Sequence, residues 1–176
     1  MNYQSFAKQL PLKTTAALFF LGLLFCSAFT VLRSPADFSG EWTLNEGKSD
    51  LGQFAAFAPR KLSISESSTG AMVQRTSVGQ DGQERTSKDS LSYDGKETES
   101  TVFGNSKKKS TVKWSDDGQT MTVNSTINLE RDGQTMEIKL TENWKLADGG
   151  KSLNLESTSS SSFGENTMKL VFDKVK

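Results

Sequence analysis

The chain of 176 residues is predicted to fold as an all-β domain behind an N-terminal hydrophobic signal helix. From Ser39 onward, apolar and polar residues alternate with period two, which is typical of strands with one buried face. Turn signals recur between these runs at fairly even spacing, and no stretch between them has the pattern of a long helix. Consecutive strands are therefore expected to pair as an antiparallel up-and-down meander, closed into a barrel of about 8–10 strands.

The first 36 residues differ from the rest of the chain. Lys8 and Lys13 precede Thr14–Leu32, a run of 19 uncharged residues whose centre is almost wholly apolar. This order is typical of a secretory signal, because the apolar run enters the bilayer while the lysines stay on the cytoplasmic side. Residues 1–36 are predicted to be a signal peptide or membrane anchor, and residues 37–176 an exported domain that is periplasmic, secreted or held at the envelope.

Three fates of this segment all place the domain outside the cytoplasm. Cleavage is expected after the small residues that end at Ala28 or, with Pro35 as a disadvantage, at Ala36. Lipidation of Cys26 is a second fate, disfavoured because bulky Phe25 stands where lipoprotein signals have a small residue. A retained anchor is the third, since 19 uncharged residues nearly span a hydrocarbon core. A buried core helix is disfavoured because nothing downstream is helical enough to pack on it.

The clearest strand runs from Met136 to Leu146. Its apolar residues fall on one face and its polar residues on the other, whereas a helix would scatter them around its circumference. The stretch from Met121 to Glu130 repeats the pattern. Shorter alternations occupy residues 62–64, 153–155 and 168–172. Half-buried strands of this kind fit antiparallel sheets with one dry face.

Turns and an internal repeat organise these strands. Asp-Gly pairs such as those at 94–95 and 117–118 favour hairpins, because both residues tolerate positive φ. The sequence Asp-Gly-Gln-Thr-Met occurs at 117–121 and again at 132–136, which suggests a repeated hairpin, the unit of an up-and-down barrel. Residues 50–59 alone break the alternation, and we expect there a short helix or apolar loop that ends at Pro59.

The residue types present exclude several kinds of chemistry. The chain has no histidine, and its one cysteine, Cys26, precedes the domain. Nucleophilic arrangements that use histidine, zinc sites of imidazole and thiolate, and a disulfide in the domain are therefore excluded. Basic and acidic residues number 21 each, and three basic but no acidic ones precede Asp37, so the domain has a net charge of −3. This argues against a nucleic-acid binder. We expect no metal and no cofactor, and membrane contact only through the N-terminal segment.

The start of the first strand carries a family resemblance. Gly40-Glu41-Trp42 has the Gly-x-Trp pattern of lipocalins and fatty-acid-binding proteins, and with Lys48-Ser49-Asp50 it resembles small exported bacterial proteins grouped as lipocalin-like (calycin-type). Residues 93–97, 144–146 and 170–174 share in this likeness. The resemblance implies a lipocalin-like barrel from Asp37 onward, closed at one end by the tryptophan, with Lys169 or Lys174 covering it. It implies no established chemistry, and the second lipocalin motif has no clear match.

Glu142 is the strongest candidate for a functional residue. It lies on the apolar face of its strand between Leu140 and Trp144, where a carboxylate loses its hydration and needs a partner. It is either a polar anchor inside a ligand cavity, a residue turned outward by strand twist or a bulge, or the structural partner of Arg75. Ser125 interrupts an apolar face in the same way, either as a cavity residue or as one of the small polar residues that barrels commonly enclose.

Aromatic and basic residues supply the other candidates. Phe54 and Phe57 lie in the connection that breaks the strand pattern, as a gate for an apolar ligand or as a plug that seals the barrel end. Trp144 is a candidate for the cavity wall, although it fits the core as well as the other two tryptophans do. The three lysines at 107–109 are expected at a hairpin, as a solvated charge run or as a contact for anionic head groups.

Three functions compete. The leading one is non-catalytic binding of a small hydrophobic or amphipathic ligand in the barrel interior, because eight or more strands leave room for one. The rival is a structural or protein-interaction module of the cell envelope, with a packed barrel, no ligand and an unidentified protein partner. The third, an acid–base enzyme, would need a second carboxylate or a tyrosine within hydrogen-bond reach of Glu142. An interior cavity of about 300 Å³ or more, lined by apolar residues, would favour binding.

Overall fold

The computed structural model describes residues 34–79, 81–102, 106–131 and 134–176, without the side chains of residues 53, 54, 131 and 134. The predicted signal or anchor run and the lipidation candidate Cys26 lie outside the described residues. In the described part of the chain, no helix is both long and apolar enough to cross a membrane. The fold that follows is that of the compact C-terminal unit alone.

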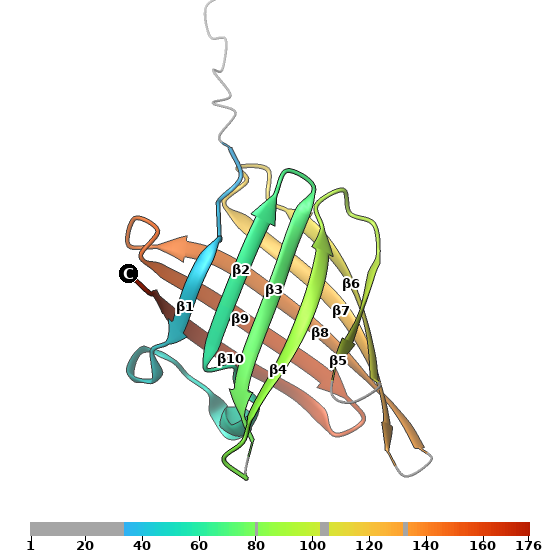
Figure 1. Cartoon of the computed structure of the whole chain (residues 1–176). Coiled ribbons are helices and arrows are strands. Elements are labelled where there is room, and N and C mark those ends of the chain that lie inside the picture. The colour runs from blue at the N-terminus through green and yellow to red at the C-terminus, as the bar shows by residue number, and fades with distance from the viewer. Residues whose placement is uncertain (1–33, 80, 103–105, 132–133) are drawn as a thin grey trace, which may run out of the picture. The chain divides into compact units, whose positions relative to one another are not determined.

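Ten strands form a single antiparallel sheet that curves into a barrel (Figure 1). The strands are β1 Gly40–Leu44, β2 Lys61–Ser67, β3 Gly70–Val78, β4 Glu84–Ser92, β5 Thr98–Val102, β6 Ser106–Trp114, β7 Thr120–Arg131, β8 Gln134–Ala147, β9 Ser152–Ser161 and β10 Gly164–Lys174. Each strand pairs with its neighbours in sequence except that β4 and β5 do not pair, and β1 also pairs with β10, so the order is β4-β3-β2-β1-β10-β9-β8-β7-β6-β5. The predicted all-β antiparallel meander is confirmed, with ten strands.

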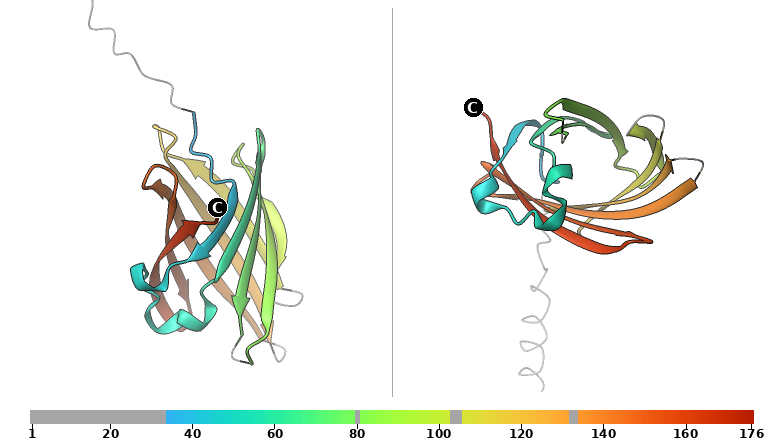
Figure 2. Two further views of the ribbon diagram at one scale, coloured as in Figure 1. Left: turned by 60° about the vertical axis from the view of Figure 1, so that its left-hand side comes forward. Right: turned by 90° about the horizontal axis from the view of Figure 1, so that it is seen from below.

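The two ends of the sheet, β4 and β5, meet without a backbone ladder. Side chains on β5 close the seam: the hydroxyl of Thr98 donates to the carbonyl oxygen of Ser90 at 2.6 Å, and the hydroxyl of Ser100 accepts from the amide of Ser90 at 3.1 Å. The barrel is therefore nearly closed (Figure 2). Its last seam depends on hydroxyl groups in place of paired peptides.

The short connections follow the sequence pattern. Gly95 and Gly118 adopt φ values of 76° and 66°, the left-handed conformation that the Asp-Gly turns require. Between β1 and β2 the chain forms two 3₁₀ helices, η1 Glu46–Lys48 and η2 Gly52–Phe57. The expected short helical element before Pro59 is thus present, and it packs against β3 and β10 at one end of the barrel.

The opposite end of the barrel is filled by aromatic side chains. Phe38 is fully buried, and its ring stacks 5.9 Å from Trp114 and meets Trp144 edge-on at 6.0 Å. The indole nitrogen of Trp42 donates to the carbonyl oxygen of Phe38 at 2.9 Å. The ammonium of Lys174 lies 5.1 Å above the ring of Trp42, so of the two lysines expected to cover this ring it is Lys174 that does so. We call this the closed end.

The expectation of a solvated charge run is wrong for one of the three lysines. Residues 107–109 lie in β6, where they pair with the preceding strand β5 as expected of a hairpin. Lys107 and Lys109 point outward, but Lys108 points inward and is only 3% exposed. Strand alternation places Lys108 on the inner face between Ser106 and Ser110. The charge is tolerated there because the carboxylate of Asp89 on β4 pairs with it.

Candidate functional site

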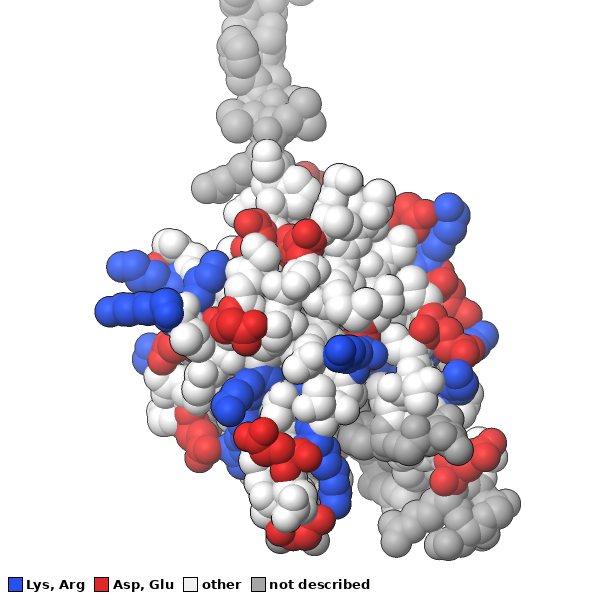
Figure 3. Space-filling model, viewed as in Figure 1, with Lys and Arg blue, Asp and Glu red and all other residues white. Residues whose placement is uncertain are grey.

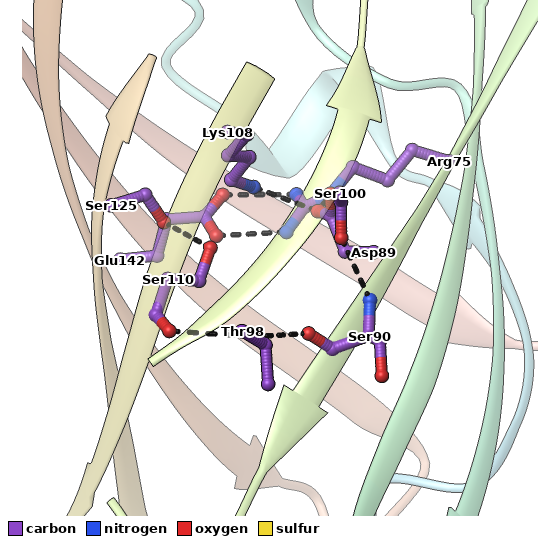
Figure 4. Close-up of polar contacts among 9 residues, drawn as sticks. All are labelled: Arg75, Asp89, Ser90, Thr98, Ser100, Lys108, Ser110, Ser125 and Glu142. Atoms are coloured by element: carbon purple, nitrogen blue, oxygen red, sulfur yellow. Dashed lines mark hydrogen bonds and ion pairs between the residues drawn. The ribbon is translucent and has the colours of Figure 1, made fainter. Parts of the chain in front are cut away.

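Four charged side chains occupy one level of the barrel interior (Figure 4). They are Arg75 on β3, Asp89 on β4, Lys108 on β6 and Glu142 on β8. Three of them have an apolar inward residue at the next inward position of their strand, whereas Lys108 lies between two inward serines. For example, Trp144 is in the core and Glu142 lies two residues along the same face of β8. We call these four residues the charged layer. They mark the level at which the packed core of the closed end stops.

Arg75 and Glu142 join opposite walls of the barrel. The two guanidinium Nη atoms of Arg75 donate to the two carboxylate oxygens of Glu142 at 2.9 and 2.8 Å, a bidentate pair. The Nε atom of Arg75 donates to Oδ2 of Asp89 at 3.2 Å, and its guanidinium carbon lies 5.3 Å from the ring centre of Trp144. Glu142 is thus turned inward and paired with Arg75, as one of the sequence hypotheses proposed.

Asp89 links this pair to Lys108. The ammonium of Lys108 donates to Oδ2 of Asp89 at 2.7 Å, and the two residues are 3% and 1% exposed. Oδ2 therefore accepts from both cations, whereas no donor in the described part of the chain reaches Oδ1, although this atom is buried as well. The layer therefore contains one buried carboxylate oxygen, Oδ1 of Asp89, that accepts no hydrogen bond from the described residues.

The four groups support one another's charges. Burial alone would lower the pKa of the Arg75 guanidinium, but Glu142 and Asp89 outweigh this effect and raise its pKa above the ordinary value. Burial alone would raise the pKa of Asp89, but the charges of Arg75 and Lys108 outweigh it and hold this pKa below its usual value. Arg75 and Asp89 are thus charged at neutral pH, and the two cations and two carboxylates balance.

Small hydroxyl groups lie beside the charged layer. Ser110 and Ser125 are both buried, and their hydroxyl oxygens are 2.9 Å apart (Figure 4). Ser157, also buried, stands opposite Glu142 in the pairing of β8 with β9. These positions keep the inner wall polar at this level without adding bulky side chains.

Beyond the charged layer, away from the closed end, the inner wall becomes apolar again. The inward positions of β8 that follow Glu142 are Leu140, Ile138 and Met136, each only partly buried. None of the three belongs to the main hydrophobic core. On β7 the facing inward residue is Ile127, which is buried but also lies outside that core. We call the three residues on β8 the mouth wall.

The predicted site residues fall into two groups. Glu142, Arg75, Ser125 and Trp144 come together at or beside the charged layer. Phe57 does not join them, because it lies in η2 at the mouth end and is 65% exposed. The side chain of Phe54 lies outside the described residues.

Sequence reasoning missed three members of the cluster, Asp89, Lys108 and Ser110. Asp89 stands two residues before Leu91, and Ser110 two residues before Val112, so both share the face of a buried residue. This two-residue spacing could have predicted that both side chains point inward. It was obscured because β4 and β6 have too few apolar residues to show which face is inward.

Two hollows are present on the surface of the domain. One of about 410 Å³ is open to the surface over β6–β8, and its lining includes the polar residues Lys109, Asn124 and Thr141 as well as Leu140. The other, of about 290 Å³, lies at the turn residues 68–69 and 92–94. Neither is the apolar interior cavity that the binding hypothesis predicts. On the face shown in Figure 3, basic and acidic side chains are interspersed. Within the described residues no group of acidic side chains is placed to hold a metal ion.

Known proteins offer little guidance. No family model matches the chain, and no curated protein matches it. Among solved structures, the zebrafish ileal bile acid-binding protein complexed with cholic acid is similar to it, at 16% sequence identity and a TM-score of 0.47. The match covers 78% of this chain and 98% of that one. A likeness of this size adds nothing about ligand or residues, so the fold and the site rest on this chain's own geometry.

Proposed function

We propose that this domain is a non-catalytic carrier that holds a small amphipathic molecule with its apolar part against the mouth wall. The observation that supports this is the inward yet partly exposed position of Leu140, Ile138 and Met136. Apolar side chains that face the interior of a barrel without being packed leave surface for an apolar ligand to cover. The helix η2 packs at this same end, where a ligand would enter.

The charged layer supports the same proposal. Four charged groups inside a small domain lose most of their hydration, and a well-packed apolar replacement is often as stable or more stable. A gain in stability alone is therefore not a sufficient reason to keep them. A polar floor between a packed core and an apolar mouth would orient a molecule that has one polar and one apolar end.

We also propose that the carrier works outside the cytoplasm. The support is the order of Lys8, Lys13 and the uncharged run Thr14–Leu32. A fusion of the full chain to a reporter enzyme active only after export tests this part separately. Reporter activity that disappears when a lysine is placed at Leu21 and another at Leu24 supports export, and activity that persists contradicts it.

Native mass spectrometry of the protein recovered from expression of the full chain tests the carrier function. We expect a reproducible excess mass that is lost on denaturation and that apolar fluorescent probes displace. Ile138→Trp, which narrows the mouth, should abolish this mass while the protein keeps its fold. Lys139→Trp, one residue away on the outer face, is the matched control and should retain it. A bare polypeptide mass without probe uptake would contradict the proposal.

A packed structural module is the second candidate, favoured by a different observation. Large side chains such as Trp42, Phe172 and Leu153 are fully buried and fill the closed end, and the charged layer ties opposite walls together. On this reading the barrel presents its outer face to an envelope partner. A folded protein with no excess mass, no probe uptake and a partner recovered by cross-linking in the envelope would establish it over the carrier.

A further inference from the structure

The charged layer limits the kind of polar group that a ligand can place against it. Resting on the proposed carrier function, we infer that the ligand carries a neutral hydroxyl head, as an alcohol or sterol does, and not a carboxylate. The hydroxyl lies between Asp89 and Lys108, and the apolar part extends along the mouth wall.

The first step is charge balance. Both Nη atoms of Arg75 donate to Glu142 and its Nε donates to Asp89, and Lys108 is paired with Asp89. The two cations therefore face two carboxylates, and no cation is left over for an anionic head. A carboxylate that entered would bring an uncompensated charge into a dehydrated site, which is strongly unfavourable.

The second step is hydrogen bonding. Oδ1 of Asp89 is buried and accepts from no described donor, so it can accept one hydrogen bond. The ammonium of Lys108 has three hydrogens, and only one hydrogen bond, to Asp89, is formed by it within the described residues. A hydroxyl group donates once and accepts, so it can satisfy Oδ1 of Asp89 and Lys108 together. A carboxylate has no hydrogen to give to Asp89.

The third step is geometry. Asp89 and Lys108 lie at the level of Glu142, and the mouth wall continues from Glu142 along β8 through three inward positions. Six residues of strand span about 20 Å, long enough for an extended alkyl chain or a fused-ring body. The head and the apolar part can therefore occupy their two environments at once.

The experiment compares three probes with one twelve-carbon chain: dodecanol, dodecanoate and dodecylamine. Their dissociation constants are measured by displacement of a fluorescent probe at neutral pH, below micelle formation, with the protein recovered from expression of the full chain. We expect dodecanol to bind about tenfold or more tightly than dodecanoate, the factor that corresponds to one charge-assisted hydrogen bond. Equal or tighter binding of dodecanoate overturns the inference but leaves the carrier function standing. Binding of none of the three contradicts both.

Variants of the charged layer make the test independent of one probe series. Asp89→Asn gives the layer an excess positive charge and should shift the preference toward dodecanoate by about tenfold. Lys108→Met gives the layer an excess negative charge and should shift the binding preference toward dodecylamine. This second variant keeps the test decisive if Asp89→Asn does not fold. Lys109→Met changes the neighbouring outward residue and should leave the order of the three affinities unchanged. An unchanged order in a folded layer variant would overturn the inference.

Discussion

At the scale of single residues, Glu142 shows how a break in a pattern can indicate a site. A carboxylate between Leu140 and Trp144 interrupts an otherwise apolar face. The structure keeps it inward and supplies Arg75 through two hydrogen bonds of 2.9 and 2.8 Å. The interaction joins β3 to β8 across the barrel. Pairing with Arg75 was one of the hypotheses from the sequence, but the pattern of one strand does not distinguish it from the others.

Glu142→Gln should strongly destabilise the domain. The substitution leaves the guanidinium of Arg75 with one carboxylate in place of two in a site where its side chain is only 14% exposed. Breaking one partner of a buried pair costs about 3–5 kcal/mol, and we expect the free energy of unfolding in urea to fall by about 3 kcal/mol. Glu156→Gln, on the exposed face of β9, is the control and should change it by less than about 0.5 kcal/mol. Equal effects of the two variants would contradict the buried pair.

The buried Asp89 should make the stability of the domain depend on pH in the acid range. The pKa of Asp89 is held below its usual value by Arg75 and Lys108, against the effect of burial. A lowered pKa stabilises the folded protein above the unfolded-state pKa of about 3.9, and this contribution is lost as pH falls through the folded-state value. Stability should therefore decline below about pH 4, less steeply in Asp89→Asn than in the wild type or in the exposed-turn control Asp116→Asn. Urea unfolding across pH measures the slopes, and parallel slopes in all three proteins would contradict this role.

At the scale of elements, the seam between β4 and β5 is the weak point of the barrel. Every other neighbouring pair of strands shares a backbone ladder, whereas this seam depends on hydroxyl groups of β5. Sequence reasoning expected closure from the number of strands, but it could not locate the seam. The position of the seam depends on how tightly each strand coils, and the coiling depends on how the interior side chains pack.

Thr98→Val should open this seam. The hydroxyl of Thr98 donates to the carbonyl oxygen of Ser90 at 2.6 Å and also approaches that of Ser110 at 3.3 Å, and valine keeps the shape without the donor. We expect a loss of about 1 kcal/mol and faster amide hydrogen exchange in β4 and β5. Thr101→Val removes an exposed hydroxyl of the same strand and is the control. Exchange rates that rise equally in both variants, or in neither, would show that Thr98 does not hold the seam.

At the scale of the whole molecule, the fold was accessible from the sequence and the site was only partly so. Long strands such as β7 and β8 alternate clearly and were predicted with nearly correct bounds. The inward lysine of β6 was missed because its neighbouring inward residues are serines, so no hydrophobic contrast marks the face. Charged partners from β3, β4, β6 and β8 meet only after the barrel curves, and periodicity along one strand carries no information about that curvature.

The segment that leads into the barrel supplies the last prediction, because the closed end is sealed by a residue that precedes β1. Phe38 is fully buried between Trp114 and Trp144, and its carbonyl accepts from the indole of Trp42. A chain that begins at Asp37 should fold cooperatively and should melt at the same temperature with and without a reducing agent, since no cysteine follows Cys26.

A chain that begins at Gly40 lacks the Phe38 ring and should lose about 3–5 kcal/mol, or about 10 °C in melting temperature. Phe38→Leu in the longer chain is the intermediate case, because it refills part of the volume and should recover part of the loss. Thermal unfolding followed by circular dichroism ranks the three proteins. Equal melting temperatures would mean that the closed end is sealed by the tryptophans alone, and that residues 37–39 are a linker and not part of the fold.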